Sequence, residues 1–337
     1  MQIAKNGIGF SRPNPSVGCV VVWNNKIIGE GFTSAYGGNH AEVNAIHSVR
    51  DKSLIKEATI YVTLEPCSHF GKTPPCADLI IKYQPRKVVI GCLDSNSLVA
   101  GKGIERLKKA GITVVVGVLK DECLQHHKRF FTVHEKKRPY ILLKWAETKD
   151  GFIAPLSKNK LKPVWISNQY SQQIVHKWRS EEQAILVGTN TVISDNPKLD
   201  VRSWFGLNPI RIVLDRNLRI PNSAHVFDKS VKTILITESK RKQKETHENI
   251  IFEIIDFSKN SANQICKVLH KHQIESLIVE GGLQTLQTFI DENLWDEAAV
   301  FVAEKEFQNG VRAPRLKKGL KEVINIKTDV LKRYKND

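Results

Sequence analysis

The sequence predicts an α/β protein made of two domains, each with a largely parallel sheet. Three observations support this. The 337 residues are enough for two cores of ordinary size. Strand-like and helix-like segments alternate through both halves, as they do in parallel sheets. A charged, helix-like stretch at 120–137 is followed by Pro139 and a new strand. We therefore expect domains at 1–137 and 138–337.

The first half begins with a predicted hairpin over 17–33, in which Asn24 and Asn25 form the turn because asparagine tolerates positive φ. Apolar residues at helical spacing predict a helix over 40–49. Proline is tolerated at the start of a helix, and the segment after Pro75 reads as one. The other expected elements are strands at 58–64, 87–93 and 112–119 and a helix at 103–111 closed by Gly111.

The second half repeats this alternation. Expected strands cover 140–147, 183–188, 209–215, 232–237, 275–280 and 297–304, and expected helices cover 172–180, 263–272 and 283–294. Residues 305–337 are rich in lysine and weakly patterned, so a peripheral, partly mobile tail is expected. No internal repeat relates the two halves.

The net charge of +16 has two interpretations, a polyanionic partner such as nucleic acid or phosphorylated small ligands. Lysine and arginine are scattered, and no aromatic-basic RNA motif is visible, which favours the second. No apolar run is long enough to span a membrane. The opening residues are too short and polar for a secretion signal. We therefore expect a cytoplasmic enzyme that binds neither nucleic acid nor membrane.

The chain has six cysteines, too few for a disulfide scaffold. Cys19 and Cys92 lie in apolar strand-like runs and are expected to be buried. Only Cys67 and Cys76, each preceded by proline, have flanks that suggest metal binding or chemistry.

Three segments indicate a zinc site: His40 at a helix start, Cys67 after a strand, and Cys76 opening a helix. One imidazole and two thiolates fill three corners of a tetrahedral Zn²⁺ and leave one for water. Such a metal lowers the pKa of its water towards roughly 7, so hydroxide can attack an amidine-like carbon.

Glu42, two residues after His40, is not a ligand by this count. It can move the proton from water to the leaving amine, as the glutamate of zinc deaminases does. Because positions two apart diverge by about 200° on a helix, His40 has to sit at the very start of the helix. The alternative is a closed structural zinc with His69 as fourth ligand, which would not need Glu42.

Four segments, 13–22, 40–46, 63–76 and 99–118, together resemble the deaminase half of the bifunctional riboflavin-biosynthesis deaminase-reductases. The nine-residue step from Cys67 to Cys76 is characteristic, since related deaminases usually space the two cysteines more tightly. The resemblance implies a cytidine-deaminase-like three-layer domain with zinc on His40, Cys67 and Cys76 and with Glu42 as proton donor. It also implies substrate contacts near Asn14, His69, Lys72 and 94–96.

This chain departs from the family pattern at several positions. Thr33 stands where members often carry His, and Ser95 and Ser97 replace the prolines of a D-P-N-P motif. Gln183 stands where the family often has Asp. The first helix is also shorter than usual, which indicates either a short helix or a misplaced start.

The second half resembles the reductase half of the same family over 138–154, 165–202, 209–221 and 276–297, with a dihydrofolate-reductase-like fold. Gly281-Gly282 before a helix is a phosphate-site candidate. The resemblance implies NADPH contacts at Ala146, Trp165, Thr191, Asp195, Arg216, Gly282, Leu283, Gln284, Thr285, Leu286, Gln287 and Thr288. It implies that the ribose-phosphate chain of the substrate meets Arg179, Leu199, Arg202 and Glu280. Lys144 and Glu280 are the candidates for a proton donor.

The resemblance implies two successive reactions. The first deaminates 2,5-diamino-6-ribosylamino-pyrimidinone 5′-phosphate, and the second uses NADPH to reduce the ribosyl group of 5-amino-6-(5-phosphoribosylamino)uracil to ribityl. We also expect a homo-oligomer. Two rival functions are a nucleic-acid deaminase, which leaves 138–337 unexplained, and a non-enzymatic zinc module, which leaves Glu42 unexplained.

Overall fold

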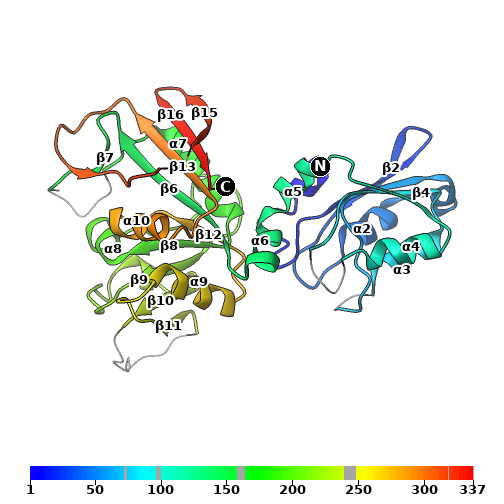
Figure 1. The fold of residues 1–337 in the computed structure, drawn as a ribbon, viewed down its shortest axis with the longest axis horizontal. Helices are drawn as coiled ribbons and strands as arrows, with labels where there is room; N and C mark the ends of the chain where they lie inside the picture. Colours follow the sequence, from blue (N-terminus) through cyan, green and yellow to red (C-terminus); the bar gives the residue numbers. More distant parts are fainter. Residues whose placement is uncertain (72–73, 96–99, 158–163, 239–247, 318, 337) are drawn as a thin grey trace. The chain divides into compact units, whose positions relative to one another are not determined.

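A computed structural model describes residues 1–71, 74–95, 100–157, 164–238, 248–317 and 319–336 (Figure 1). The chain divides into two compact units, Met1–Lys137 and Arg138–Asp337. Among the described residues, no helix has the length and apolarity needed to cross a membrane.

The first unit is built on a sheet with strand order β2-β1-β3-β4-β5. Its strands are β1 (Gly18–Trp23), β2 (Lys26–Phe32), β3 (Thr59–Leu64), β4 (Lys87–Cys92) and β5 (Thr113–Val116). β1 pairs antiparallel with β2 and β3, whereas β3, β4 and β5 run parallel. The hairpin prediction is confirmed: Asn24 and Asn25 have φ of 45° and 59°, as a tight β1–β2 turn requires.

Helices cover both faces of this sheet. They are α1 (Gln2–Lys5), α2 (Ala41–Ser48), α3 (Cys76–Tyr83), α4 (Lys102–Lys109), α5 (Lys120–His126) and α6 (Lys128–Lys136), with a 3-10 turn η1 (Lys52–Glu57). Gly18 lies against α1, and its cross-strand partner is Phe32. The neighbouring Gly31 therefore points to the opposite face, where it lies against α2. The result is the expected three-layer, cytidine-deaminase-like domain.

The second unit contains a nine-stranded sheet with the order β11-β10-β9-β8-β12-β6-β13-β16-β15. The strands are β6 (Tyr140–Thr148), β8 (Ala184–Gly188), β9 (Ile210–Leu214), β10 (Thr233–Thr237), β11 (Ile250–Ile254), β12 (Ser276–Val279), β13 (Glu297–Ala303), β15 (Leu320–Ile326) and β16 (Asp329–Lys335). The strands from β11 to β13 are parallel, and β16 and β15 extend the sheet antiparallel. A small separate sheet pairs β7 (Phe152–Ala154) with β14 (Val311–Arg312).

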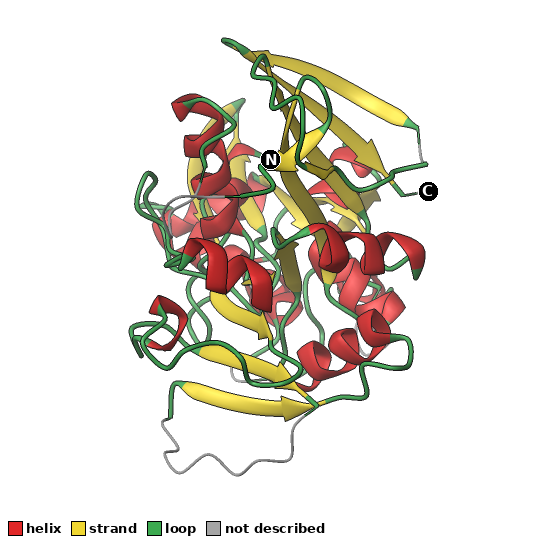
Figure 2. Cartoon of the chain, turned by 90° about the vertical axis from the view of Figure 1, so that its left-hand side faces the viewer, coloured by secondary structure: helices red, strands yellow, loops and turns green. Residues whose placement is uncertain are grey.

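Two hydrophobic cores lie on the two faces of the long sheet, and Figure 2 shows helices on both sides of its strands. The helices are α7 (Gln169–Glu181), α8 (Thr189–Asp195), α9 (Ser261–Lys271) and α10 (Leu283–Asp291), with a 3-10 turn η2 (His225–Phe227). Ile141 and Leu143 of β6 belong to the core shared with α9 and α10. Leu142, between them, belongs to the core shared with α7. This alternation is what a parallel strand covered on both faces requires.

The expectation of a peripheral tail at 305–337 was wrong. Residues 320–326 and 329–335 are strands of the main sheet, and β16 lies between β13 and β15. The sequence pattern is weak because β15 is an edge strand that exposes nearly every side chain. In β16, only Asp329 and Leu331 are buried, and backbone pairing holds the rest. The elements α8, β7 and β11 were not predicted either.

Candidate active sites

The predicted metal ligands come from three loops that meet beside the first sheet. His40 is the residue that caps α2, with extended backbone (φ −74°, ψ 164°). Cys67 lies in the loop after β3, and Cys76 is the first residue of α3. One donor atom from each residue lies within 4.8 Å of the others. His40 therefore stands at the very start of its helix, as the spacing to Glu42 demands.

The distances within this cluster suit a tetrahedral metal. His40 Nδ1 is 3.5 Å from Cys67 Sγ and 3.3 Å from Cys76 Sγ. Zinc bonds of about 2.0–2.3 Å at tetrahedral angles place ligand atoms roughly 3.5 Å apart, so the donor set fits Zn²⁺. His69 is exposed and is not part of the group. Among the described residues, the cluster thus offers three ligands, not the four of a closed site.

Hydrogen bonding favours the ionised form of Cys67. The Cys76 thiol donates to it, which lowers the pKa of Cys67, and the His40 ring lowers it further. The Cys76 backbone N–H also donates to Cys67 Sγ at 3.3 Å. Since the metal binds thiolates, this environment prepares Cys67 as a ligand.

Glu42 lies in the first turn of α2 and is 4% exposed. Burial raises its pKa to about 7, and the nearby Cys67 contributes to the shift. A carboxyl group with a pKa near the working pH can both accept and donate a proton. Glu42 is therefore suited to proton transfer beside the cluster.

The other predicted deaminase residues are more dispersed. Asn14 is half-buried and forms a turn with Ser11, whereas His69 is exposed. Asp94 is buried. Thr33, which replaces a family histidine, uses its hydroxyl to accept from Val17 N at 3.0 Å. Lys72, Asn96 and Ser97 lie outside the described residues.

The second unit contains a cavity of about 2650 Å³. This is larger than the roughly 300–1,000 Å³ of a typical single-ligand pocket, so a cofactor and a substrate fit together. Every residue that the resemblance assigned to NADPH or to the reductase substrate lines it: Ala146, Trp165, Thr191, Asp195, Arg216, Gly282, Leu283, Gln284, Thr285, Leu286, Gln287 and Thr288 for the first, and Arg179, Leu199, Arg202 and Glu280 for the second.

One wall of the cavity is the turn between β12 and α10. Gly282 has φ of +60°, a left-handed value that favours glycine. A Cβ on Gly281 would lie 2.4 Å from Val187 Cα, so only glycine lets the turn pack here. The first backbone amides of α10 have no partner within the helix and point a partial positive charge at the cavity. This cradle fits the phosphates of a dinucleotide.

The polar centre of the cavity is Glu280, which follows β12. Arg179 donates to it through Nε and Nη2, at 2.9 and 2.8 Å, and Lys144 Nζ lies 3.8 Å away. Burial raises the pKa of Glu280, but the two cations outweigh burial and lower it to about 2. Burial is also the main reason why the pKa of Lys144 is lowered. Glu280 is therefore ionised at neutral pH, and Lys144 loses its proton more readily than an exposed lysine.

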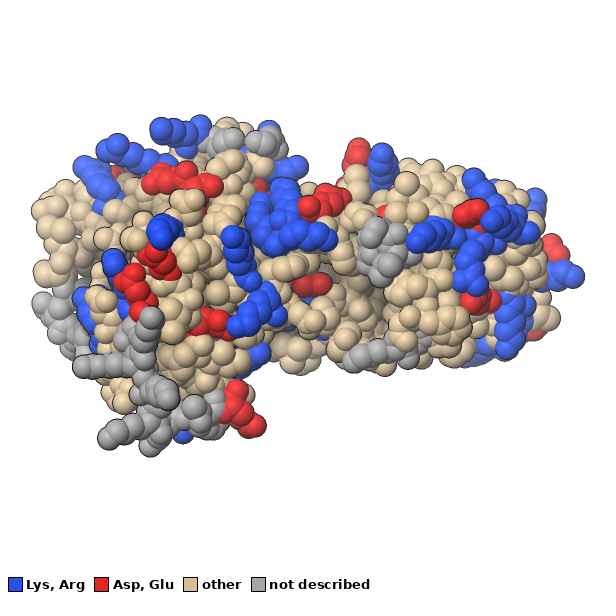
Figure 3. Space-filling view, turned by 60° about the horizontal axis from the view of Figure 1, so that its bottom comes forward, with Lys and Arg blue, Asp and Glu red and all other residues tan. Residues whose placement is uncertain are grey.

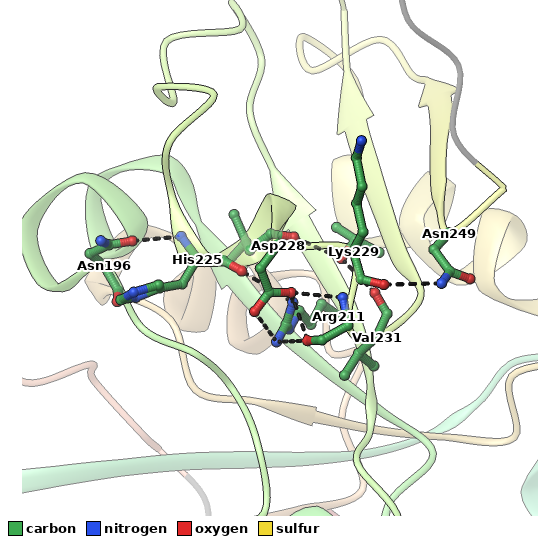
Figure 4. Close-up of polar contacts among 10 residues, drawn as sticks. Asn196, Arg211, His225, Asp228, Lys229, Val231 and Asn249 are labelled. Carbon is green, nitrogen blue, oxygen red and sulfur yellow. Dashed lines mark hydrogen bonds and ion pairs between the residues drawn. The ribbon is translucent and has the colours of Figure 1, made fainter.

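A hydrogen-bonded network around the buried Arg211 joins two residues of the cavity wall, Asn196 and His225 (Figure 4). Arg211 of β9 is 1% exposed and forms an ion pair with Asp228 at 2.6 Å. It also donates to the carbonyl of His225 at 3.2 Å. The N–H of His225 donates to Asn196 Oδ1 at 2.8 Å. Because Asn196 ends α8, this chain of contacts fixes the end of the helix that carries Asp195.

Several lining residues were missed by the sequence reasoning. Arg312, Arg315 and Lys317 belong to the segment that was expected to be a tail, and Asn190 and Arg219 carry no motif. Only the position of β14 in the fold identifies the first three. Lysine and arginine are otherwise spread over the visible surface of both units and interspersed with acidic residues (Figure 3).

Family models match both units. Residues 1–92 match the cytidine and deoxycytidylate deaminase zinc-binding region, and residues 139–317 match the RibD C-terminal domain. The chain is therefore a zinc-binding deaminase joined to a reductase. It is 42% identical over 313 residues to the riboflavin biosynthesis protein RibD of Aquifex aeolicus, covering 92% of this chain and 86% of the relative. The RibD of Actinobacillus pleuropneumoniae is 39% identical, covering 90% and 82%.

The chain belongs to the RibD family of bifunctional riboflavin-biosynthesis enzymes. Solved structures support the same family assignment. The diaminohydroxyphosphoribosylaminopyrimidine deaminase/5-amino-6-(5-phosphoribosylamino)uracil reductase of Thermotoga maritima superposes with a TM-score of 0.90 at 36% identity, covering 99% of this chain and 95% of that one. The RibD of Acinetobacter baumannii gives 0.89 at 34%, covering 99% and 96%.

The protein is thus a deaminase and reductase of riboflavin biosynthesis that uses zinc and NADPH and acts on a small phosphorylated pyrimidine. Its second domain has the expected dihydrofolate-reductase-like fold.

Proposed function

We propose that His40, Cys67 and Cys76 bind the zinc ion of the deaminase and leave one coordination position open. The observation that carries this is the meeting of three donor atoms within 4.8 Å of one another, next to a buried glutamate. When bound, the metal makes a water molecule acidic enough to serve as nucleophile at neutral pH. The deaminase domain is residues 1–137.

Glu42 is the catalytic acid and base of this reaction. Its carboxylate takes a proton from the attacking water and delivers it to the leaving amine. The pKa of about 7 suits both steps. Asn14 and His69 contact the substrate, 2,5-diamino-6-ribosylamino-pyrimidinone 5′-phosphate. The exposure of His69 leaves it free to turn towards a ligand.

Residues 138–337 form the reductase domain. Ala146, Trp165, Thr191, Asp195, Arg216 and the residues from Gly282 to Thr288 hold NADPH, which supplies the reducing equivalents. Arg179, Leu199, Arg202 and Glu280 bind the ribose-phosphate part of the substrate. Arg202 suits the phosphate because its planar fork can bind two oxygens at once, whereas the fork of Arg179 is held by Glu280.

Lys144 is the better of the two candidate proton donors in the reductase. Burial lowers its pKa, whereas Glu280 has a pKa of about 2 and carries no proton at neutral pH. Glu280 instead orients Arg179 and Lys144 through the contacts that it makes with both.

The ligand types indicate the cellular compartment and the partners of the protein. Two thiolates that bind zinc have to stay reduced, which points to the cytoplasm. Small phosphorylated ligands account for the basic charge without a nucleic-acid or membrane partner. A homo-oligomer remains a prediction, which light scattering on the purified protein would check.

The test is to incubate the purified protein with the diaminopyrimidine phosphate, with and without NADPH. Without NADPH, we expect ammonia release and accumulation of the deaminated uracil product. With NADPH, we expect one NADPH oxidised for each ammonia released. Treatment with a zinc chelator should stop ammonia release and leave reduction of added uracil substrate intact. Oxidation of NADPH without any ammonia release would contradict the assignment.

A further inference from the structure

Cys67 differs from the other two proposed ligands because it lies neither on a helix nor at the cap of one. His40 caps α2 and Cys76 begins α3, whereas Cys67 lies in the loop between β3 and α3. The position of its sulfur therefore depends on what fixes this loop. The first turn of α3 contacts Cys67 through two backbone amides, Cys76 N to Sγ and Ala77 N to the carbonyl. On the other side of the loop, two side chains, Glu65 and Arg106, join it to α4.

Glu65 lies two residues before Cys67 and is 3% exposed. Among the described residues, four backbone N–H groups donate to its carboxylate. Oε1 accepts from Gly103 at 3.0 Å and Ile104 at 3.3 Å. Oε2 accepts from Gly101 at 3.0 Å and from Asp94 at 3.3 Å. The carboxylate thus caps the amino end of α4, where free amides and the helix dipole favour a negative charge.

Arg106 makes the second link, one turn further along α4. Its Nη1 donates to the carbonyl of Ser68 at 2.8 Å. Its Nη2 forms an ion pair with Asp78 of α3, the helix that Cys76 begins. Cys67 therefore lies in the sequence between two residues that are bound to α4. Glu65 precedes it, and Ser68 follows it.

The helix also lies directly against the loop. A Cβ on Gly103 would be 2.2 Å from the carbonyl oxygen of Pro66, so any larger residue would push α4 away. Glycine at 103 lets the backbone of α4 reach both Pro66 and the Glu65 carboxylate.

We propose that Glu65 and Arg106 are positioning residues for the zinc centre, which hold the Cys67 sulfur in place by fastening its loop to α4. This inference rests on the proposed role of Cys67 as a zinc ligand. Glu65 also fixes Asp94, so the same carboxylate links the metal loop to the segment beginning at 94. Neither side chain is one of the three proposed metal ligands.

The test compares three variants of the full-length zinc protein. Glu65→Gln places an amide NH₂ against backbone donors, and Arg106→Met removes both links of Arg106 while keeping its apolar stem. The matched control is Glu105→Gln, on the same helix, where the exposed carboxylate pairs with Lys109. Zinc release to a chromogenic chelator is measured, followed by the visible spectrum after substitution with cobalt(II).

Partners that orient metal ligands typically change metal affinity or activity by about 10–100-fold. We expect Glu65→Gln to release zinc about 10–100-fold faster and to shift the thiolate-dependent cobalt bands. Arg106→Met should give a smaller change in the same direction. In both, kcat of deamination should fall while reduction of added uracil substrate stays normal. Glu105→Gln should match the wild type in every measurement.

A purely structural role would lower the melting temperature and leave the cobalt spectrum of the folded protein unchanged, and that result would overturn the proposal. Wild-type zinc release in Arg106→Met would also overturn it, even if Glu65→Gln fails to fold. The proposed zinc site is a separate claim. It would be contradicted if the wild-type protein bound no zinc, or if the Cys67→Ser variant kept its zinc.

Discussion

The two catalytic regions are built in opposite ways. The proposed zinc site is compact, since its outermost ligands are 36 positions apart in the sequence and the three donor atoms lie within 4.8 Å of one another. The reductase cavity collects residues between Lys144 and Lys317 from elements far apart in the sequence, including β6, α7, α8, α10 and β14. Metal chemistry needs a few atoms at fixed distances, whereas holding a dinucleotide and a sugar phosphate needs a large surface. Single substitutions should therefore abolish the first activity and only weaken the second.

The largest effect is expected at the metal ligands. Cys76→Ser should lose zinc and reduce ammonia release to background, because one hard hydroxyl replaces a soft thiolate. NADPH oxidation with added uracil substrate should remain normal. Metal analysis and the two rate assays measure this. Cys266→Ala, which changes another buried thiol, serves as the control. Stoichiometric zinc in Cys76→Ser would rule out its role as a ligand.

The second-largest loss of deaminase activity is expected from a substitution of Glu42. Glu42→Gln should keep zinc but slow deamination by about 10²–10⁴-fold, the usual contribution of a general acid-base group. The exposed Glu57→Gln is the matched control and should behave as wild type. Turnover near the wild-type rate, with zinc in place, would remove Glu42 from the mechanism.

Much of this contrast is visible in the sequence. His40, Glu42, Cys67 and Cys76 were identified from residue type and spacing, because metal coordination restricts both. The elements that carry them were also predicted to within about two residues. The reductase residues were accessible only through family resemblance, since hydrogen-bonding side chains scattered over a domain leave no local pattern.

Other features had no sequence signal at all. Glu65 was given no role from the sequence, because its partners are backbone amides that any residue supplies. Strands β15 and β16 were missed because backbone pairing at this end of the sheet needs few apolar side chains. Gln183, where the family often has Asp, forms two hydrogen bonds in this fold. Its side chain accepts from Glu275 N at 2.8 Å and donates to the carbonyl of Gln273 at 3.1 Å.

Within the reductase domain, the ionised Glu280 side chain should add measurably to the free energy of unfolding. Its pKa is lowered from 4.5 to about 2 in the folded state. Its contribution is therefore fully present above about pH 4.5 and is lost as pH falls towards 2. Glu280→Gln should cost on the order of 3 kcal/mol at pH 7, and this difference should shrink over that window.

Calorimetry of wild type and variant between pH 7 and about pH 2 measures the difference. Glu238→Gln, which breaks an exposed ion pair with Arg216, is the control and should change stability little. A cost for Glu280→Gln that stays constant across the whole range would contradict the ionised state of Glu280.

The smallest effect is expected at Arg202, whose side chain is 46% exposed. Arg202→Ala should raise KM of the reductase for its uracil substrate by about 10-fold, because one charge-assisted contact to phosphate is lost. Deamination should be unchanged. Arg333→Ala, on a similarly exposed arginine outside the cavity, is the control. Equal loss of both activities would argue against separate sites.

The central claim is that zinc is held by one imidazole and two thiolates with a fourth position left for solvent. Zinc X-ray absorption spectroscopy on the purified protein tests it most directly. We predict two sulfur atoms at about 2.3 Å and two nitrogen or oxygen atoms at about 2.0–2.1 Å, one of which exchanges when a substrate analogue binds. A zinc shell already filled by four protein atoms and insensitive to the analogue would contradict the account.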